Sequence, residues 1–211
     1  NRRGEYRKRF ANVLHEMEEL AAQGEAGHSE EVADYLNWRM DHLNSDDGYF
    51  DKMPSGGWDE TKQKAEERTR QWDTERNKAM SEIRVKAETS SAVLRPHWLV
   101  QCGAMEFRHR RYQHAADFFE RVREAFPEHP RAEVAMLMLA RMKFDEWKQE
   151  RESWPHEETK VSRLENEAEE GFENYLKLYP KGRFAADAIG WQGGMRRERG
   201  YPGAAMEMFL L

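Results

Sequence analysis

The chain has 211 residues, of which 35% are charged and 38% are hydrophobic, and its formal net charge is −6. A net negative charge is unfavourable for a dedicated nucleic-acid-binding protein, and no apolar run reaches the roughly 18 residues that a transmembrane helix needs. The single cysteine, Cys102, excludes an internal disulfide.

Residues 1–58 predict a helical hairpin followed by a loop. Apolar residues recur at helical spacing over 3–22, and again over 30–43, where Ser29 is the expected N-cap. The segment 44–58 is rich in Gly, Ser and Asp. Its three aspartates do not follow the EF-hand spacing, so we predict a turn-rich loop and not a calcium site.

Residues 59–91 predict one long charged helix, with its helical part over 59–89. Between Asp59 and Glu88 it carries 8 acidic and 8 basic residues. Its apolar stripe is narrow: Ala65, Trp72, Ala79, Met80, Ile83 and Ala87. We predict that Trp72 packs on the N-terminal hairpin; the alternative is that the stripe meets a partner or another subunit as a short coiled coil.

Residues 92–211 contain a pattern that recurs at three places. Its anchors are Ala115, Phe119 and Pro127, then Ala168, Phe172 and Pro180, then Ala205 and Phe209. The step from Ala to Phe is four residues in each copy, and the step from Phe to Pro is eight in the first two. The pattern predicts three pairs of helices, over 96–109 and 112–125, 131–150 and 158–178, and 183–199 and 202–211.

This pattern resembles the tetratricopeptide repeat (TPR), in which small residues let paired helices approach and aromatic residues fill the space between pairs. The run from Phe172 to Pro180, with Tyr175, Leu176 and Tyr179, is similar to the variant found in outer-membrane assembly lipoproteins and Tol-Pal-associated proteins of bacteria. One departure is the interval from Phe119 to Phe172, which is 53 residues instead of the usual 34 or so.

The resemblance implies an all-α fold: a TPR-like, right-handed α-solenoid of antiparallel helix pairs that follows a helical N-terminal region. The expected organisation is 1–58, 59–91 and 92–211, with repeats at about 96–129, 130–181 and 182–211. The third repeat ends inside its second helix without a cap, so we expect that the chain is part of a longer array or stops at a fragment boundary. The long second repeat leaves open whether the acidic segment 145–173 is an ordered insert or a flexible arm.

The sequence contains no motif that predicts catalysis, a cofactor or a metal site. The eight histidines do not follow a metal-binding spacing, and no nucleophile elbow or phosphate-binding glycine loop occurs. Cys102 lies in a packed repeat helix and is predicted to be a buried, inert thiol. Gly193 and Gly194 are predicted to permit close helix packing. We therefore predict that the chain is not an enzyme.

In TPR proteins, ligand-binding residues usually lie on the first helix of each pair and face a concave groove. Carried over by this resemblance, the partner-binding positions are His97, Val100, Ala104, Phe107 and Arg108. On this interpretation His97 and Arg108 hold a carboxylate, and Phe107 stacks on an apolar side chain.

The predicted function is a non-catalytic scaffold that binds a peptide or helix of a partner protein. One alternative is an accessory or regulatory region of a larger enzyme. Another is a helical-repeat nucleic-acid binder that uses the arginines near 2–9, 108–111 and 196–199, although the strip 108–111 beside Tyr112 is also explained as a solvated turn. The subfamily resemblance favours a periplasmic or envelope-associated location over a cytoplasmic one, with peripheral or lipid-anchored membrane association open. The oligomeric state is not predicted.

Overall fold

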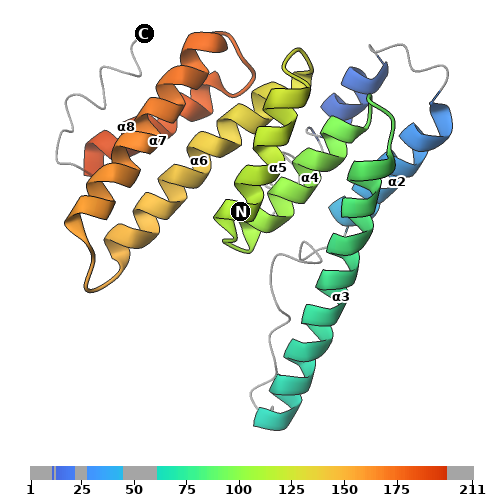
Figure 1. The fold of residues 1–211 in the computed structure, drawn as a ribbon, viewed down its shortest axis with the longest axis horizontal. Coiled ribbons are helices and arrows are strands. Elements are labelled where there is room, and N and C mark those ends of the chain that lie inside the picture. Colours follow the sequence, from blue (N-terminus) through green and yellow to red (C-terminus); the bar gives the residue numbers. More distant parts are fainter. Residues whose placement is uncertain (1–10, 12, 22–27, 45–60, 199–211) are drawn as a thin grey trace. The chain divides into compact units, whose positions relative to one another are not determined.

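The computed structural model describes residues 11, 13–21, 28–44 and 61–198, and all regular secondary structure within these ranges is α-helical (Figure 1). The prediction of an all-α protein is therefore confirmed. The chain divides into two compact units, Asn1–His109 and Arg110–Leu211. Across the ranges that are described, no helix combines the length and apolarity required to span a bilayer.

Among its described residues, the first unit has three helices and a shorter helical segment: α2 (Ser29–Asn44), α3 (Lys62–Thr89), α4 (Arg95–Arg108) and residues 13–21. The hydroxyl oxygen of Thr61 accepts a hydrogen bond from the backbone N–H of Lys64 and caps α3. Within α3, the buried residues Met80, Ile83 and Ala87 all lie in the C-terminal part, where α3 packs against α4. The predicted apolar stripe is thus buried over only part of its length.

An aromatic cluster joins α2 to α4. The ring of Tyr35 meets that of Trp98 edge-on at 4.9 Å between centroids, and Trp38 meets Trp98 at 5.2 Å. Such edge-to-face pairs contribute about 0.5–1.5 kcal/mol beyond the area they bury. Cys102 is fully buried beside this cluster on α4, as predicted for an inert thiol.

Trp72 lies half-buried on α3, and its ring meets that of His109, at the C-cap of α4, at 5.7 Å. The guanidinium of Arg76 lies over the indole at 4.9 Å. Packing of Trp72 on the N-terminal hairpin stays a prediction, since part of that hairpin lies outside the residues that the structure describes. Helix α3 runs along α4, which brings this part of α3 to the end of α4.

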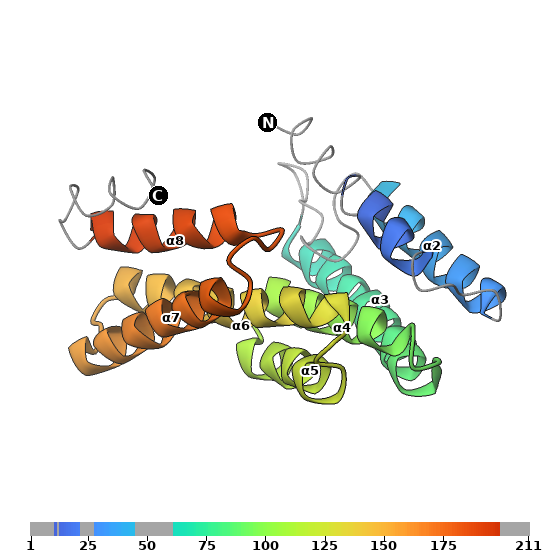
Figure 2. The ribbon, with the colours of Figure 1, turned by 90° about the horizontal axis from the view of Figure 1, so that it is seen from above.

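The described part of the second unit contains four helices: α5 (Tyr112–Ala125), α6 (Pro130–Glu152), α7 (Glu158–Leu178) and α8 (Ala185–Glu198). Helix α6 packs against both α5 and α7, and α7 packs against α8. Within this unit, α5 and α8 lie on opposite sides of α6 (Figure 2). Pro130 begins α6, where a residue without a backbone N–H is tolerated.

The alanine and phenylalanine anchors of the first two repeats lie in the core of the second unit. Ala115 and Phe119 on α5, and Ala168 and Phe172 on α7, are all fully buried. A Cβ added at Gly171 would lie 2.9 Å from the Cβ of Ala140 on α6, so a small residue is required where α6 and α7 approach. The spacing of small and aromatic residues therefore identified the buried faces of both helices.

The long interval between the first two repeats is accounted for by helix length. Helices α6 and α7 have 23 and 21 residues, whereas α4 and α5 have 14 each. The acidic segment 145–173 forms the end of α6, a short loop and most of α7. It is an ordered helical hairpin and not a flexible arm.

Most predicted helix bounds agree with the structure, and those of α5 and α7 coincide with it. The cap of α2 is one residue earlier than predicted, because the His28 carbonyl accepts the N–H of Val32 and Ser29 is already helical.

The close helix packing predicted at Gly194 is not seen. A Cβ added at this residue would meet no described atom within 4 Å.

Several predictions fall outside the residues that the structure describes. These are the whole basic segment 2–9 with the start of the helix 3–22, nearly all of the loop 44–58, and the last helix, 202–211, with Ala205 and Phe209.

Candidate functional site

An open pocket of about 440 Å³ lies in the second unit, where α6 contacts both of its neighbours. Its lining comes from Arg110 just before α5, the start of α5, the C-terminal half of α6 and the start of α7. The lining residues are Arg110, Tyr112, Gln113, Lys143, Glu146, Gln149, Glu150, Lys160, Arg163 and Leu164. We call this the charged pocket; its lining carries four cationic and two carboxylate side chains.

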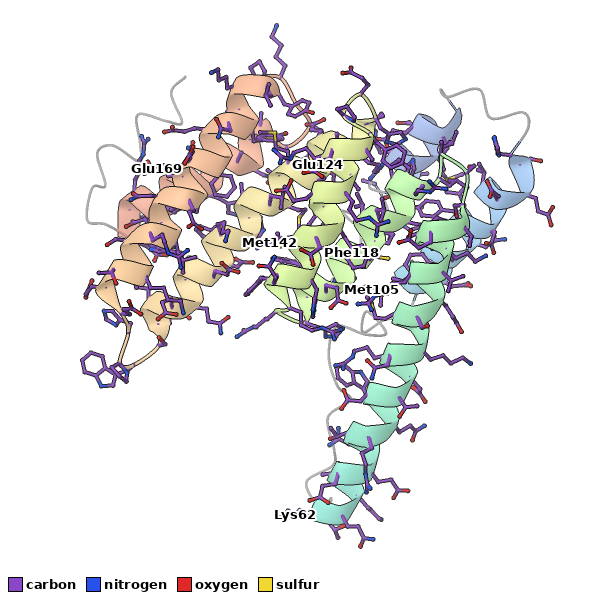
Figure 3. All side chains as sticks on the ribbon, in the orientation of Figure 1. Lys62, Met105, Phe118, Glu124, Met142 and Glu169 are labelled. Atoms are coloured by element: carbon purple, nitrogen blue, oxygen red, sulfur yellow. The ribbon has the colours of Figure 1, made fainter. Side chains whose placement is uncertain are left out.

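The helical register of α6 separates the charged pocket from the core. Met142 is almost fully buried, while Lys143 and Glu146 face the pocket. Figure 3 shows Met142 on α6 and Glu169 on α7 among the side chains of this unit. Neighbouring residues on a helix point about 100° apart, so a single helix supplies both the core and the pocket.

Ion pairs hold most of the cations of the charged pocket. The Nζ of Lys143 lies 3.4 Å from Glu146 and 3.1 Å from Glu167, and Arg163 lies 2.9 Å from Glu167. Burial alone would lower the pKa of Lys143, but the hydrogen bond and the charge of Glu167, together with Glu146, raise it. Burial would likewise raise the pKa of Glu167, and Lys143 and Arg163 lower it. Lys143 and Glu167 are therefore both charged at neutral pH.

A further pair closes the charged pocket near the α6–α7 loop. The Nζ of Lys160 donates to a carboxylate oxygen of Glu150 at 2.5 Å, and this hydrogen bond lowers the pKa of Glu150. A solvent-accessible pair of this kind contributes little to stability. An incoming anion can therefore exchange with Glu150 or Glu167 at small cost.

Arg110 differs from the other cations of the charged pocket. Its side chain is exposed and forms no hydrogen bond or ion pair within the described part of the chain. Its backbone has φ 58°, the left-handed region that follows many helices and is usually occupied by glycine. A non-glycine residue in this conformation costs of the order of 1 kcal/mol. Arg110 thus occupies a position where its backbone is strained.

The start of α5 adds hydrogen-bond donors to the same wall. Tyr112 and Gln113 occupy the first turn, where backbone N–H groups point out of the helix and favour a negative charge. Burial raises the pKa of Tyr112, so its hydroxyl remains a neutral donor. Guanidinium, ammonium, hydroxyl and amide groups together suit a carboxylate or phosphate oxygen.

The residues predicted by resemblance lie elsewhere, on α4 of the first unit. His97 is fully buried, with its ring 5.3 Å from that of Tyr35, and Val100 is buried as well. Ala104 and Phe107 are half-buried and Arg108 is exposed. Binding of a partner at these five positions remains a prediction.

The sequence contained part of the signal for the charged pocket. The basic strip 108–111 beside Tyr112 is one of the arginine clusters that the sequence offers for nucleic-acid binding, with a solvated turn as the other interpretation, and Arg110 and Tyr112 line the pocket. Lys143, Lys160 and Arg163 were missed. Lys160 and Arg163 belong to the segment 145–173, which has many more carboxylates than cations. Its net negative charge gave no indication that these two cations lie on one face of α7.

The chain matches no protein-family model, no curated protein and no solved structure. Within the described ranges, no group of three or more His, Cys, Asp or Glu side chains is arranged to hold a metal ion. The arrangement of the charged pocket is therefore the observation from which function is argued.

Proposed function

We propose that this chain is a non-catalytic interaction scaffold that holds a segment of a partner protein, and that an acidic group of this segment binds in the charged pocket. The observation that carries the proposal is the pocket itself, which is open and has two more cations than carboxylates in its lining. Arg110 supports it further, because its cation is available and its strained backbone has no evident structural benefit.

We also propose that the helices of the second unit belong to a TPR-like, right-handed array. This is supported by the burial of Ala115, Phe119, Ala168 and Phe172 at equal spacing, and by the close approach of Gly171 to α6. The bacterial, envelope-associated role stays part of the same proposal and rests on the sequence resemblance alone.

The polar character of the charged pocket sets the kind of segment it would take. Leu164 is its one aliphatic side chain, so a large apolar group would gain little there. An Asp or Glu side chain, or a C-terminal carboxylate, would instead gain charge-assisted hydrogen bonds.

The experiment is a pull-down from cells that produce this protein, with partners identified by mass spectrometry. Four proteins are compared: wild type, Arg110→Glu/Arg163→Glu in the charged pocket, Phe107→Ala/Arg108→Glu on α4, and the control Lys181→Glu. Lys181 is exposed and lies outside the pocket, so it tests charge reversal alone. Circular dichroism first establishes that all four fold.

We expect a partner that is retained by the Lys181→Glu and α4 variants and lost from the pocket variant. Loss from the α4 variant alone would move the binding site to the positions predicted by resemblance. If the pocket variant retains every partner, the role of the charged pocket is wrong. Recovery of nucleic acid by wild type, with strong dependence on salt, would favour the alternative function.

A further inference from the structure

The loop between α6 and α7 exposes a large aromatic side chain. Trp154 is 88% exposed, whereas Trp98 and Trp147 are buried and the other described tryptophans are half-buried. Tryptophan carries a large apolar surface and is among the residues most enriched in binding hot spots. An indole that remains in water is therefore a candidate anchor for a partner.

Local hydrogen bonds order this loop. The backbone N–H of Ser153 donates to the carbonyl of Gln149 at 3.1 Å, and its hydroxyl donates to the carbonyl of Glu150 at 2.6 Å. His156 bonds Glu158 at 2.9 Å, and its ring meets the indole of Trp154 edge-on at 6.0 Å. A side chain presented from an ordered loop loses less conformational entropy on binding.

The loop is also continuous with the charged pocket. Glu150 and Lys160 line that pocket, are joined by a hydrogen bond of 2.5 Å, and stand on either side of the loop in the two helices it connects. A segment that places a carboxylate against Arg163 and leaves the pocket past this pair reaches the α6–α7 loop.

The charges around Trp154 indicate what the loop can meet. Glu152, Glu157 and Glu158 are exposed, and Arg151 is engaged by Glu198 at 3.0 Å. A loop with this acidic excess is repelled by an anionic bilayer, although an exposed tryptophan alone would suit a membrane interface. The surroundings of the indole thus favour a polypeptide.

We propose that Trp154 is a second anchor for the partner segment that binds in the charged pocket. The segment carries an acidic residue for the pocket and, further along its chain, an apolar or aromatic side chain that packs on the indole. This inference rests on the proposed function, and it specifies the partner by two features at a fixed separation.

The test is a selection from a displayed library of random dodecapeptides on three immobilised proteins: wild type, Trp154→Ala and Arg110→Glu/Arg163→Glu. On wild type we expect peptides that combine Asp or Glu with an aromatic or aliphatic residue at a constant spacing. On Trp154→Ala the acidic residue should persist and the apolar one should disappear. A peptide selected on the wild-type protein should bind Trp154→Ala at least tenfold more weakly than it binds wild type. The same peptide should bind Trp154→Phe nearly as tightly as it binds wild type.

The outcomes separate the two proposals. Acidic peptides that bind Trp154→Ala as tightly as wild type would overturn the inference and leave the charged pocket intact. Selection of the same peptides by the pocket variant, or no enrichment on wild type, would overturn the proposed function and the inference with it. Binding of wild type, but not Trp154→Ala, to phosphatidylglycerol vesicles would assign the indole to a membrane and would also overturn the inference.

Discussion

The two units use carboxylates in opposite ways. In the first unit, Glu16 is 2% exposed and Glu106 is fully buried, each with an arginine partner on another helical segment. In the second, Glu150 and Glu167 are half-buried and pair with cations at an open pocket. Buried charges fix a structure because removing one partner leaves the other without solvent, whereas half-exposed charges can exchange partners cheaply. We infer that the first set maintains the fold and the second is available for binding.

The largest effect on stability is expected where the buried Glu16–Arg39 pair of the first unit is broken. Arg39 donates to Glu16 at 2.7 Å, and Tyr35 donates to the same carboxylate at 3.1 Å. Arg39→Met should lower the free energy of unfolding by about 3 kcal/mol, because the buried carboxylate loses its cation. Urea denaturation followed by circular dichroism measures the loss.

The double variant Glu16→Gln/Arg39→Met is the matched control for this prediction. It removes the charge that Arg39→Met leaves behind, so it should recover part of the lost stability. If Arg39→Met alone costs less than about 1 kcal/mol, the pair behaves as a surface pair and the contrast between the units fails.

A smaller effect is expected at a buried polar contact between two helices of the second unit. The hydroxyl of the fully buried Tyr175 donates to Glu133 at 2.7 Å and accepts from the N–H of Phe184 at 3.2 Å. Burial and the neighbouring Glu133 raise the pKa of Tyr175, so it stays neutral. Tyr175→Phe should cost about 2 kcal/mol, while the control Tyr179→Phe should stay within about 0.5 kcal/mol. Equal losses in the two variants would show that ring packing, and not the hydroxyl, holds α7 to α6.

The pH dependence of the second unit should come partly from the cap of α6. The Nδ1 of His129 accepts the N–H of Arg131 at 3.1 Å, and burial, with the charge of Arg131, lowers the pKa of His129 to about 4. A lowered histidine pKa means that protonation favours the unfolded chain. The contribution of the His129 cap to folding stability is therefore complete above about pH 6.5, the usual pKa of histidine, and is lost as the pH falls toward 4.

We expect this loss to be about 1 kcal/mol, the usual contribution of an N-cap, because His129 is only half-buried. His129→Asn keeps a capping side chain without a titrating one, so the difference in unfolding free energy between it and wild type should change over this pH interval. Parallel pH profiles for the two proteins would exclude the cap as the titrating group.

The smallest effect on stability should accompany a gain in binding. Glu167→Gln releases Lys143 and Arg163 from their shared carboxylate and should change the unfolding free energy by less than about 1 kcal/mol. An acidic peptide should bind this variant several-fold more tightly, since it no longer competes with Glu167. Glu173→Gln, an exposed position on the same helix, is the control. Isothermal titration calorimetry measures the affinity of both variants for the peptide. Weaker binding by Glu167→Gln than by wild type would contradict the exchange of partners.

The sequence predicted the helices better than it predicted the site. Helix bounds followed from local signals, such as the apolar spacing of Ala168 and Phe172 and the prolines that end the repeats. The charged pocket unites Arg110, Lys143 and Lys160 from three stretches of chain, and their meeting depends on how far α6 and α7 extend beside α5. That extension appeared in the sequence only as an interval of 53 residues, which indicates either an insertion or an unusually long first helix in the second repeat.

The positions on α4 show a second limit of sequence reasoning. His97 matches a ligand-facing position of the repeat, yet in the structure it is fully buried against Tyr35 of α2. The N-terminal helices that cover it are not part of the repeat pattern. A resemblance confined to 92–211 could not show that another segment occupies this face.

The central claim, that the charged pocket binds an acidic segment, is tested most directly by Arg110→Gly. Glycine relieves the backbone strain at φ 58° and removes the guanidinium, so stability and binding should change in opposite directions. We predict that the free energy of unfolding rises by about 1 kcal/mol and that the affinity for an acidic peptide selected on wild type falls about tenfold or more. A variant that is more stable and binds the peptide as tightly as wild type would contradict the account.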